Sequence, residues 1–214
     1  LGIDHHADIK SIYEVLIDDV PMAQVVQVST ESPGVTCVPA TIHLAGAEIE
    51  LVSLVAREQR LRTAIETYIA STPTPPDFVL IDCPPSLGLL TVNAFVAAKE
   101  VLIPIQCEYY ALEGLSQLIK SIEMIKKHLN PALELSTILL TMYDSRTKLA
   151  SQVADEVKLH FPQQVLSTII PRSVRVSEAP SYGRTVISYD RTSPGAIAYL
   201  EAAIEIANRG ANRG

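Results

Sequence analysis

The sequence predicts an α/β fold, namely a doubly wound, mostly parallel sheet with helices on both faces. Four short apolar runs rich in β-branched residues alternate with longer stretches in which apolar residues recur at helical spacing. Strands and helices in this order are joined by right-handed crossovers. The chain has 214 residues, 48% of them apolar, which is enough to bury the core of one domain. We therefore expect residues 1–214 to form a single domain.

The predicted strands are apolar runs without polar–apolar alternation, which is typical of strands buried on both faces of a parallel sheet. They are FVLID (78–82), VLIPI (101–105), LSTILLT (135–141) and QVLSTII (164–170). Because ligands of such sheets bind at the carboxyl ends of the strands, the residues that end these runs are candidates for a site. These candidates are Asp82, Gln106, Thr141 to Asp144, and Pro171 with Arg172.

The predicted helices lie between and after the strands. The clearest, residues 111–130, has a stripe of leucine and isoleucine side chains opposite charged ones and ends before Pro131. Similar patterns predict helices at 60–71 and 149–161. A last helix begins at Ser193-Pro194, because serine suits the N-cap and proline the first turn.

Asp82 ends the first apolar run and is followed by the rigid turn Pro84-Pro85. Nucleotide hydrolases hold magnesium with an aspartate in this position, usually through water, because the carboxylate is close to the phosphates and anchored by the sheet. The alternative role for such a residue is to cap the following turn or helix. Asp82 is thus a candidate catalytic and magnesium-binding residue.

The charge of the chain is unevenly distributed. Its formal net charge of −7 is unfavourable for binding nucleic acid as a whole. Residues 1–56 hold eight acidic residues and one lysine, however, and so account for the excess. The segment from Thr141 to Thr192 contains seven lysines and arginines and only five acidic residues. A local basic patch is therefore compatible with the acidic total.

Membrane and metal-site signals are weak in this sequence. No apolar run approaches the roughly 20 residues that a bilayer span requires, and the first ten residues lack a signal-peptide pattern, so we expect a cytoplasmic protein. Cys37, Cys83 and Cys107 have no C-x-x-C spacing, which argues against a zinc site and a disulfide framework. We expect them to be buried, reduced thiols.

Five segments together carry a more specific pattern. They are PATIHLAGAEIELVSLVARE (39–58), DFVLIDCPPSLGLLTVNAF (77–95), LTMYDSRTKL (140–149), TIIPRSVRVSEAPSYGRTVISYD (168–190) and SPGAIAYLEAAIEI (193–206). This set resembles the ParA/Soj chromosome- and plasmid-partitioning ATPases, the deviant-Walker relatives of MinD. The segment from Asp77 resembles the Walker B and switch II region of that family, and the resemblance covers essentially the whole chain.

The resemblance implies a P-loop NTPase-like fold that uses ATP and Mg²⁺. It implies that Asp82 holds Mg²⁺ through the water molecules of its shell. It also implies that the turn containing Pro84 senses the γ-phosphate. Adenine recognition in the family uses loops that correspond here to Thr141-Met142 and to the backbone around Pro171. Ordinary strand ends are the alternative interpretation of these residues.

The resemblance also implies partners. Family members bind DNA non-specifically as ATP-bound homodimers, through basic residues near the equivalents of Arg146, Arg172 and Arg175. Arginine suits this task because its rigid fork of donors matches a phosphate group without reading sequence. A solvated arginine face is the alternative. A centromere-binding protein of the ParB type is expected to stimulate hydrolysis, and the protein is expected on the nucleoid in the cytoplasm.

The phosphate loop of the family has no counterpart in these 214 residues. None of the nine glycines belongs to a G-x-x-x-x-G-K-[ST] arrangement. By the resemblance, the chain begins just after a second aspartate of the family, so we expect an ATPase domain that is incomplete at its N-terminus. Because backbone N–H groups and a lysine of the loop supply most of the charge stabilisation, we predict poor ATP binding and no measurable hydrolysis by this chain alone, but hydrolysis by the full-length parent.

Other functions fit some of the same features. One is a non-catalytic DNA- or partner-binding module that has no phosphate loop. Another is a MinD-like membrane ATPase, but this needs a basic amphipathic C-terminal helix, and the last helix has Glu201 and Glu205 and no lysine. A relative of the nitrogenase iron protein is disfavoured, because the cysteines do not match those that hold its bridging cluster.

Overall fold

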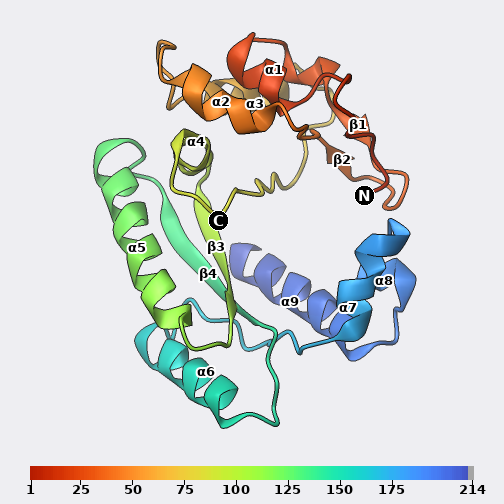
Figure 1. Cartoon of the computed structure of the whole chain (residues 1–214), viewed down its shortest axis with the longest axis vertical. Helices are drawn as coiled ribbons and strands as arrows, with labels where there is room; N and C mark the ends of the chain where they lie inside the picture. The colour runs from red at the N-terminus through yellow and green to blue at the C-terminus, as the bar shows by residue number, and fades with distance from the viewer. Residues whose placement is uncertain (212–214) are drawn as a thin grey trace. The chain divides into compact units, whose positions relative to one another are not determined.

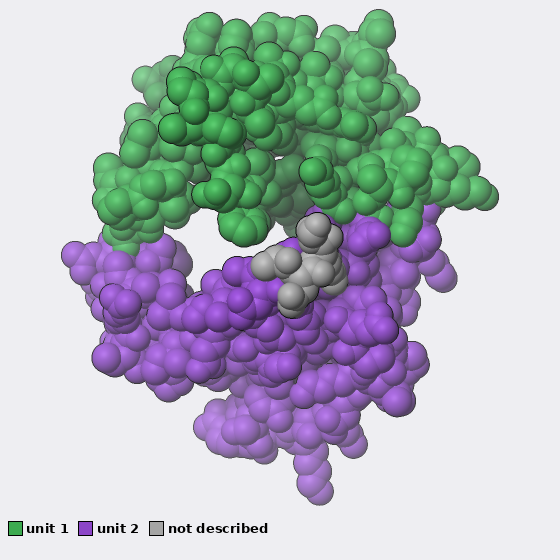
Figure 2. All heavy atoms as spheres, turned by 180° about the vertical axis from the view of Figure 1, so that it is seen from behind, with its two compact units in different colours: residues 1–99, 124–133 green, residues 100–123, 134–214 purple. Residues whose placement is uncertain are grey.

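The computed structural model describes residues 1–211 and consists of two compact units (Figure 1). Unit 1 comprises residues 1–99 and 124–133, and unit 2 comprises residues 100–123 and 134–214 (Figure 2). The long helix α5 contributes residues to both units. The prediction of a single domain over residues 1–214 stays a prediction.

Unit 1 is built mainly from short helices. Its elements are α1 (Ile12–Ile17), the 3₁₀ turn η1 (Met22–Gln24), β1 (Gln27–Val28), β2 (Thr36–Cys37), α2 (Leu44–Leu51), α3 (Arg60–Ser71) and α4 (Leu89–Ala97). The strands β1 and β2 pair antiparallel. Helix α1 begins at a capping box. Ser11 Oγ accepts a hydrogen bond from the backbone N–H of Tyr13, and the Glu14 carboxylate accepts a hydrogen bond from the backbone N–H of Ser11.

The core of unit 1 lies between α1, α3 and α4, where Leu16, Leu61 and Ala94 belong to one buried cluster. Asn93 of α4 is fully buried, and both polar atoms of its side chain form hydrogen bonds with the backbone. Its Nδ2 donates to the carbonyl oxygens of Arg57 (2.7 Å) and Leu89 (2.9 Å), and its Oδ1 accepts from the backbone N–H of Leu61 (3.2 Å). Asn93 thus fixes α4 to the start of α3.

Unit 2 contains the parallel sheet and the remaining helices. Its elements are β3 (Glu100–Gln106), the first part of α5 (Ala111–His128), β4 (Glu134–Thr141), α6 (Lys148–His160), α7 (Val174–Glu178), the 3₁₀ turn η2 (Ala179–Tyr182), α8 (Val186–Tyr189) and α9 (Pro194–Ala211). β3 and β4 pair in parallel, from Glu100 opposite Glu134 to Gln106 opposite Thr141. Helix α9 begins as predicted, with Ser193 Oγ accepting from the backbone N–H of Ala196.

Residues 164–171 run parallel to the other edge of β4, but as an interrupted strand. Isolated bridges join Val165 to Ile138 and Pro171 to Tyr143. Between them, the N–H groups of Ser167 and Thr168 donate to the Glu205 carboxylate of α9, at 2.8 and 3.0 Å, instead of to a neighbouring strand. The strand predicted at 164–170 is therefore correct in position and direction but is broken by this side-chain contact.

Helices cover both faces of this sheet. Ile103 and Ile105 of β3 face α5 and Leu149 of α6, whereas Leu139 of β4 packs on the opposite face with Ala202 of α9. The predicted α/β class is thus confirmed. The helices predicted at 60–71, 111–130, 149–161 and from Pro194 onward correspond to α3, α5, α6 and α9.

Two strand predictions need correction. Residues 78–82 form no strand, and Phe78 and Leu80 are 70% and 90% exposed. No strand within residues 1–211 pairs with this segment, and an unpaired strand leaves its backbone donors and acceptors unsatisfied by a ladder. Burial on both faces holds for β4 but is wrong for β3, in which buried and exposed residues alternate.

Two further observations concern membranes and thiols. None of the helices in the described residues is both long and apolar enough to cross a bilayer. Cys107 is buried as predicted, but Cys83 is exposed and Cys37 is half-buried. The prediction of a buried thiol is therefore wrong for Cys83, which lies in the irregular stretch after residue 82.

Candidate nucleotide and DNA site

The carboxyl end of β4 lies beside the segment that contains Pro171. Thr141 Oγ1 donates a hydrogen bond to the carbonyl oxygen of Ile105 (3.1 Å), which ties the ends of β3 and β4 together. One residue beyond Met142, the N–H of Tyr143 donates to Ile170 O (3.1 Å), and its carbonyl accepts from Arg172 N (2.9 Å). The structure therefore places two predicted nucleotide-binding segments, Thr141-Met142 and Pro171, at one edge of unit 2.

Met142 has an unusual backbone conformation. Its φ of 53° lies in the left-handed region, which residues with a side chain other than Asn or Asp seldom adopt. The chain turns there directly after β4, and the turn is held by the hydrogen bonds of Thr141 and Tyr143 on either side. Such strained residues cluster at ligand sites, so this turn favours the predicted role of Met142 in nucleotide binding.

Asp82 and Pro84 belong to unit 1. Both are exposed and lie in an irregular stretch between Thr72 and Gly88, so the prediction that Asp82 sits at the tip of a buried strand is wrong. Residues 78–82 form no strand because no strand in the described residues pairs with them. The carboxylate itself is accessible for a ligand. Its roles in catalysis and magnesium binding, and that of Pro84 beside the nucleotide, stay predictions.

Arg146 is held by Asp144 in the turn after β4. Its Nε and Nη2 donate to the two carboxylate oxygens at 2.9 and 2.7 Å, and its backbone N–H donates to Oδ1 at 3.1 Å. These bonds from Arg146, together with the charge of Arg172, lower the pKa of Asp144 to about 2. The backbone hydrogen bonds of Tyr143 with Ile170 and Arg172 bring the Arg146 turn and the Pro171 segment to the same edge.

Arg172 forms an ion pair with Glu108, which lies 64 residues earlier in the chain. The distance between Arg172 Nη2 and Glu108 Oε1 is 3.2 Å, and both side chains are more than half exposed. Glu108 follows the end of β3, two residues after Gln106. Gln106 is predicted at this edge because it ends a strand, whereas Glu108 is not predicted there, although it lies only two residues further along the same turn.

Arg175, on α7, contacts two carboxylates. Its Nη1 lies 3.2 Å from Glu178 Oε2, and its Nε lies 3.5 Å from Asp190 Oδ2. The ring of Tyr189 stacks on that of Tyr182 with centroids 5.0 Å apart, and its hydroxyl donates to Glu178 at 3.5 Å. The contact with Glu178 raises the pKa of Arg175. All three arginines predicted to bind DNA are therefore exposed, and each is paired with at least one carboxylate.

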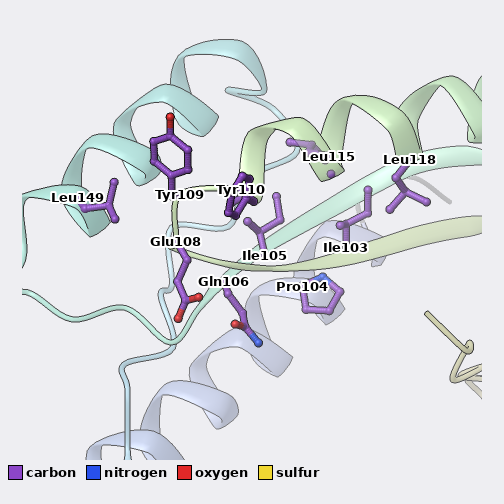
Figure 3. A pocket seen from close by; sticks show the side chains of 12 residues that line it. Ile103, Pro104, Ile105, Gln106, Glu108, Tyr109, Tyr110, Leu115, Leu118 and Leu149 are labelled. Carbon is purple, nitrogen blue, oxygen red and sulfur yellow. The ribbon is translucent and has the colours of Figure 1, made fainter. Parts of the chain in front are cut away.

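A shallow apolar pocket lies next to Glu108. It has a volume of about 650 Å³ between β3, the turn at Tyr109 and Tyr110, the start of α5, and Leu149. Figure 3 shows the isoleucine side chains of β3 directed into this pocket, whereas Gln106 and Glu108 point to the opposite side. Gln106 and Glu108 are nevertheless among the residues that line the pocket, so the acid that contacts Arg172 borders its apolar surface.

Comparison with known proteins decides the family. A family model described as an AAA domain matches residues 1–135. The sporulation initiation inhibitor protein Soj of Bacillus subtilis is 49% identical over 211 residues, which are 98% of this chain and 81% of Soj. The chromosome partitioning protein ParA of Caulobacter vibrioides is 47% identical over 213 residues, which are 100% of this chain and 79% of that protein. This chain belongs to the Soj/ParA family of chromosome-partitioning ATPases.

Solved structures agree with the fold of the Soj/ParA family. A crystal structure of cobyrinic acid a,c-diamide synthase from Mycobacterium smegmatis, with bound ADP and magnesium, superposes with a TM-score of 0.73 at 36% identity. The match covers 90% of this chain and 69% of that one. The P-loop NTPase-like fold expected from the sequence is therefore confirmed, and the nucleotide and the ion are observed in that relative.

The residues of this Soj/ParA chain fit Mg²⁺ and ATP only in part. Magnesium is commonly bound through one or two carboxylates together with phosphates and water, so the exposed Asp82 has the right chemistry without further acidic neighbours. Consistent with this, the described residues contain no group of three or more His, Cys, Asp or Glu side chains that could hold a metal by themselves. These 214 residues contain no phosphate loop that could bind the β- and γ-phosphates of ATP.

Proposed function

We propose that this chain is the DNA-binding and nucleotide-sensing part of a chromosome- or plasmid-partitioning ATPase. The protein would bind DNA non-specifically as an ATP-bound homodimer, and a ParB-type partner would stimulate its hydrolysis. This role belongs in the cytoplasm, on the nucleoid. The DNA-binding part is carried by one observation, the exposure of Arg146, Arg172 and Arg175, whose side chains are 83%, 54% and 54% accessible. Accessible guanidinium groups can reach phosphates from outside the molecule.

The nucleotide-sensing role rests on two parts of the chain. Asp82 would hold the water shell of Mg²⁺, and the turn containing Pro84 would respond to the γ-phosphate. Thr141, Met142 and Pro171 would face the adenine, which is supported by their common edge and by the strained turn at Met142. ATP hydrolysis requires a phosphate-binding loop in addition to these residues.

A binding module without catalytic activity is the second candidate. It describes residues 1–214 taken by themselves, which contain no G-x-x-x-x-G-K-[ST] pattern. The MinD-like alternative lacks such support, because α9 carries Glu201 and Glu205 and no lysine, and Glu205 is engaged by the backbone of Ser167 and Thr168. Anionic lipid would attract a basic helix instead.

The proposal is tested by titrating a fluorescent duplex DNA with the purified chain, with and without ATP and Mg²⁺. Non-specific binding through arginines predicts that affinity falls steeply as the salt concentration rises and does not depend on the DNA sequence. Tighter binding with ATP supports the nucleotide-sensing part. Equal binding is the result expected of these 214 residues alone, because we predict that they bind ATP poorly, and it leaves the DNA-binding part supported. No binding under either condition contradicts the DNA-binding part of the proposal.

A further inference from the structure

We propose that Glu108, Asp144, Glu178 and Asp190 are built-in competitors of DNA, which hold the DNA-binding arginines in ion pairs and so limit the affinity for DNA. The inference rests on the proposed DNA-binding function. These four carboxylates are called the competing acids below. They imply that a DNA phosphate must displace a carboxylate at each arginine before it can bind there.

Each of the three arginines is paired with a carboxylate. Arg146 contacts Asp144 at 2.7 Å, Arg172 contacts Glu108 at 3.2 Å, and Arg175 contacts Glu178 at 3.2 Å. Asp190 adds a second acid for Arg175 at 3.5 Å. A guanidinium group offers a fixed fork of donors, and a carboxylate occupies the same donors that a phosphate would use.

The competing acids come from different distances along the chain. Asp144 and Glu178 are local, two and three residues from their arginines, as surface pairs often are. Glu108 is different, because it reaches Arg172 from the turn after β3, across 64 residues of sequence. The parallel sheet therefore brings this acid to the basic edge. Its turn is fixed by the Glu108 N–H, which donates to Gln106 O at 2.8 Å.

The ion pairs of Arg172 and Arg175 are accessible to solvent. Both partners of the Arg172 and Arg175 pairs are more than 40% exposed, apart from Asp190, so water and salt screen these contacts. Exposed pairs of this kind are weak, and we expect each carboxylate to reduce DNA affinity by about two- to fivefold. Competition of this size makes binding reversible and sensitive to salt without preventing it.

The test compares four variants, Glu108→Gln, Asp144→Asn, Glu178→Gln and Asp190→Asn, in the same DNA titration at several salt concentrations. Each substitution keeps the shape of the side chain and removes one negative charge. Glu201→Gln and Asp155→Asn are matched controls, because they remove the same charge from exposed positions of α9 and α6. Circular dichroism of every variant confirms that the fold is retained.

The inference predicts that the variants of the competing acids bind about two- to fivefold more tightly than their matched controls. It also predicts that Glu108→Gln has no such effect in an Arg172→Ala background, since no arginine is left to release. Equal affinities for competing-acid variants and controls would overturn the inference while leaving the proposed function intact. Absence of salt-sensitive DNA binding in every protein would overturn both.

Discussion

Arg172 and Glu108 face each other across 3.2 Å, although 64 residues separate them in the chain. The contact joins the turn after β3 to the segment after Ile170, and so it spans the edge where the parallel strands end. In the function that we propose, this edge would contact both the nucleotide and DNA. The pair holds the Arg172 guanidinium group beside the turn after β3.

Asp144 is expected to titrate far below an ordinary aspartate. Its pKa is lowered to about 2 by the bonds from Arg146, against about 3.9 for an unperturbed side chain. Because the folded-state pKa is the lower one, the pair contributes fully above about pH 4 and is lost as the pH falls through about 2. An NMR titration of the Asp144 carboxyl carbon checks this. Arg146→Ala should return the midpoint toward the ordinary value, and an ordinary midpoint in the unmodified chain would contradict the geometry.

Glu205 is expected to stabilise unit 2 through its contacts with Ser167 and Thr168. Burial raises the pKa of Glu205. The hydrogen bonds from the backbone N–H groups of these residues and the charge of Arg209 together lower the pKa by more, so the net shift is downward. We predict that Glu205→Gln lowers the free energy of unfolding by about 1.5–3 kcal/mol at pH 7. Urea unfolding measures the difference.

The pH dependence gives a second check on Glu205. A lowered pKa means that the stabilisation is present above the unfolded value of about 4.3 and is lost as the pH falls through the folded value. The difference between the unmodified chain and Glu205→Gln should therefore shrink at pH 3. The control is Glu201→Gln, one turn earlier on α9 and exposed, which should change stability little. Equal stability of all three proteins at pH 7 would refute the role of Glu205.

Asn93 is expected to be essential for unit 1. It is fully buried and makes three hydrogen bonds to the backbone of Arg57, Leu61 and Leu89. Asn93→Ala leaves buried backbone groups unpaired, so we predict a loss of about 2 kcal/mol or more in the free energy of unfolding. Asn208→Ala, at an exposed position of α9, serves as the control. A loss for Asn93→Ala no larger than that of the control would show that water replaces these bonds.

The 214-residue chain is expected to show no measurable ATP hydrolysis. The sequence contains no phosphate loop to stabilise the charge that develops during phosphoryl transfer. A sensitive phosphate-release assay with Mg²⁺ should give the rate of the buffer blank. Turnover above the blank that disappears in Asp82→Ala would contradict this prediction and would mean that the chain completes a catalytic site by other residues.

Local patterns were sufficient to predict much of the fold. The helices α3, α5, α6 and α9 follow from apolar periodicity, and β3 and β4 follow from β-branched runs. The segment 78–82 has the same kind of pattern but forms no strand, because strand formation depends on a partner that a local pattern cannot supply. Similarly, the break at Ser167 depends on Glu205, a side chain 38 residues away.

The candidate site was predictable to a similar extent. The rule that ligands bind at the carboxyl ends of parallel strands brought Thr141, Met142 and Pro171 to one edge, and the structure has them there. The pairing of the arginines was not foreseen, because exposed ion pairs depend on side-chain geometry rather than on sequence spacing. Glu108 is the clearest case, since only the sheet brings it to Arg172.

The most direct test of the central claim is the salt dependence of DNA binding after removal of the arginines. We predict that Arg146, Arg172 and Arg175 changed together to alanine weaken binding strongly and reduce the slope of log affinity against log salt by about 0.9 for each lost phosphate contact. Alanine at Lys99, Lys120 and Lys127, which are also exposed, removes the same charge as a control and should change the slope much less. Equal affinities and slopes for the unmodified chain and the triple arginine variant would contradict the account.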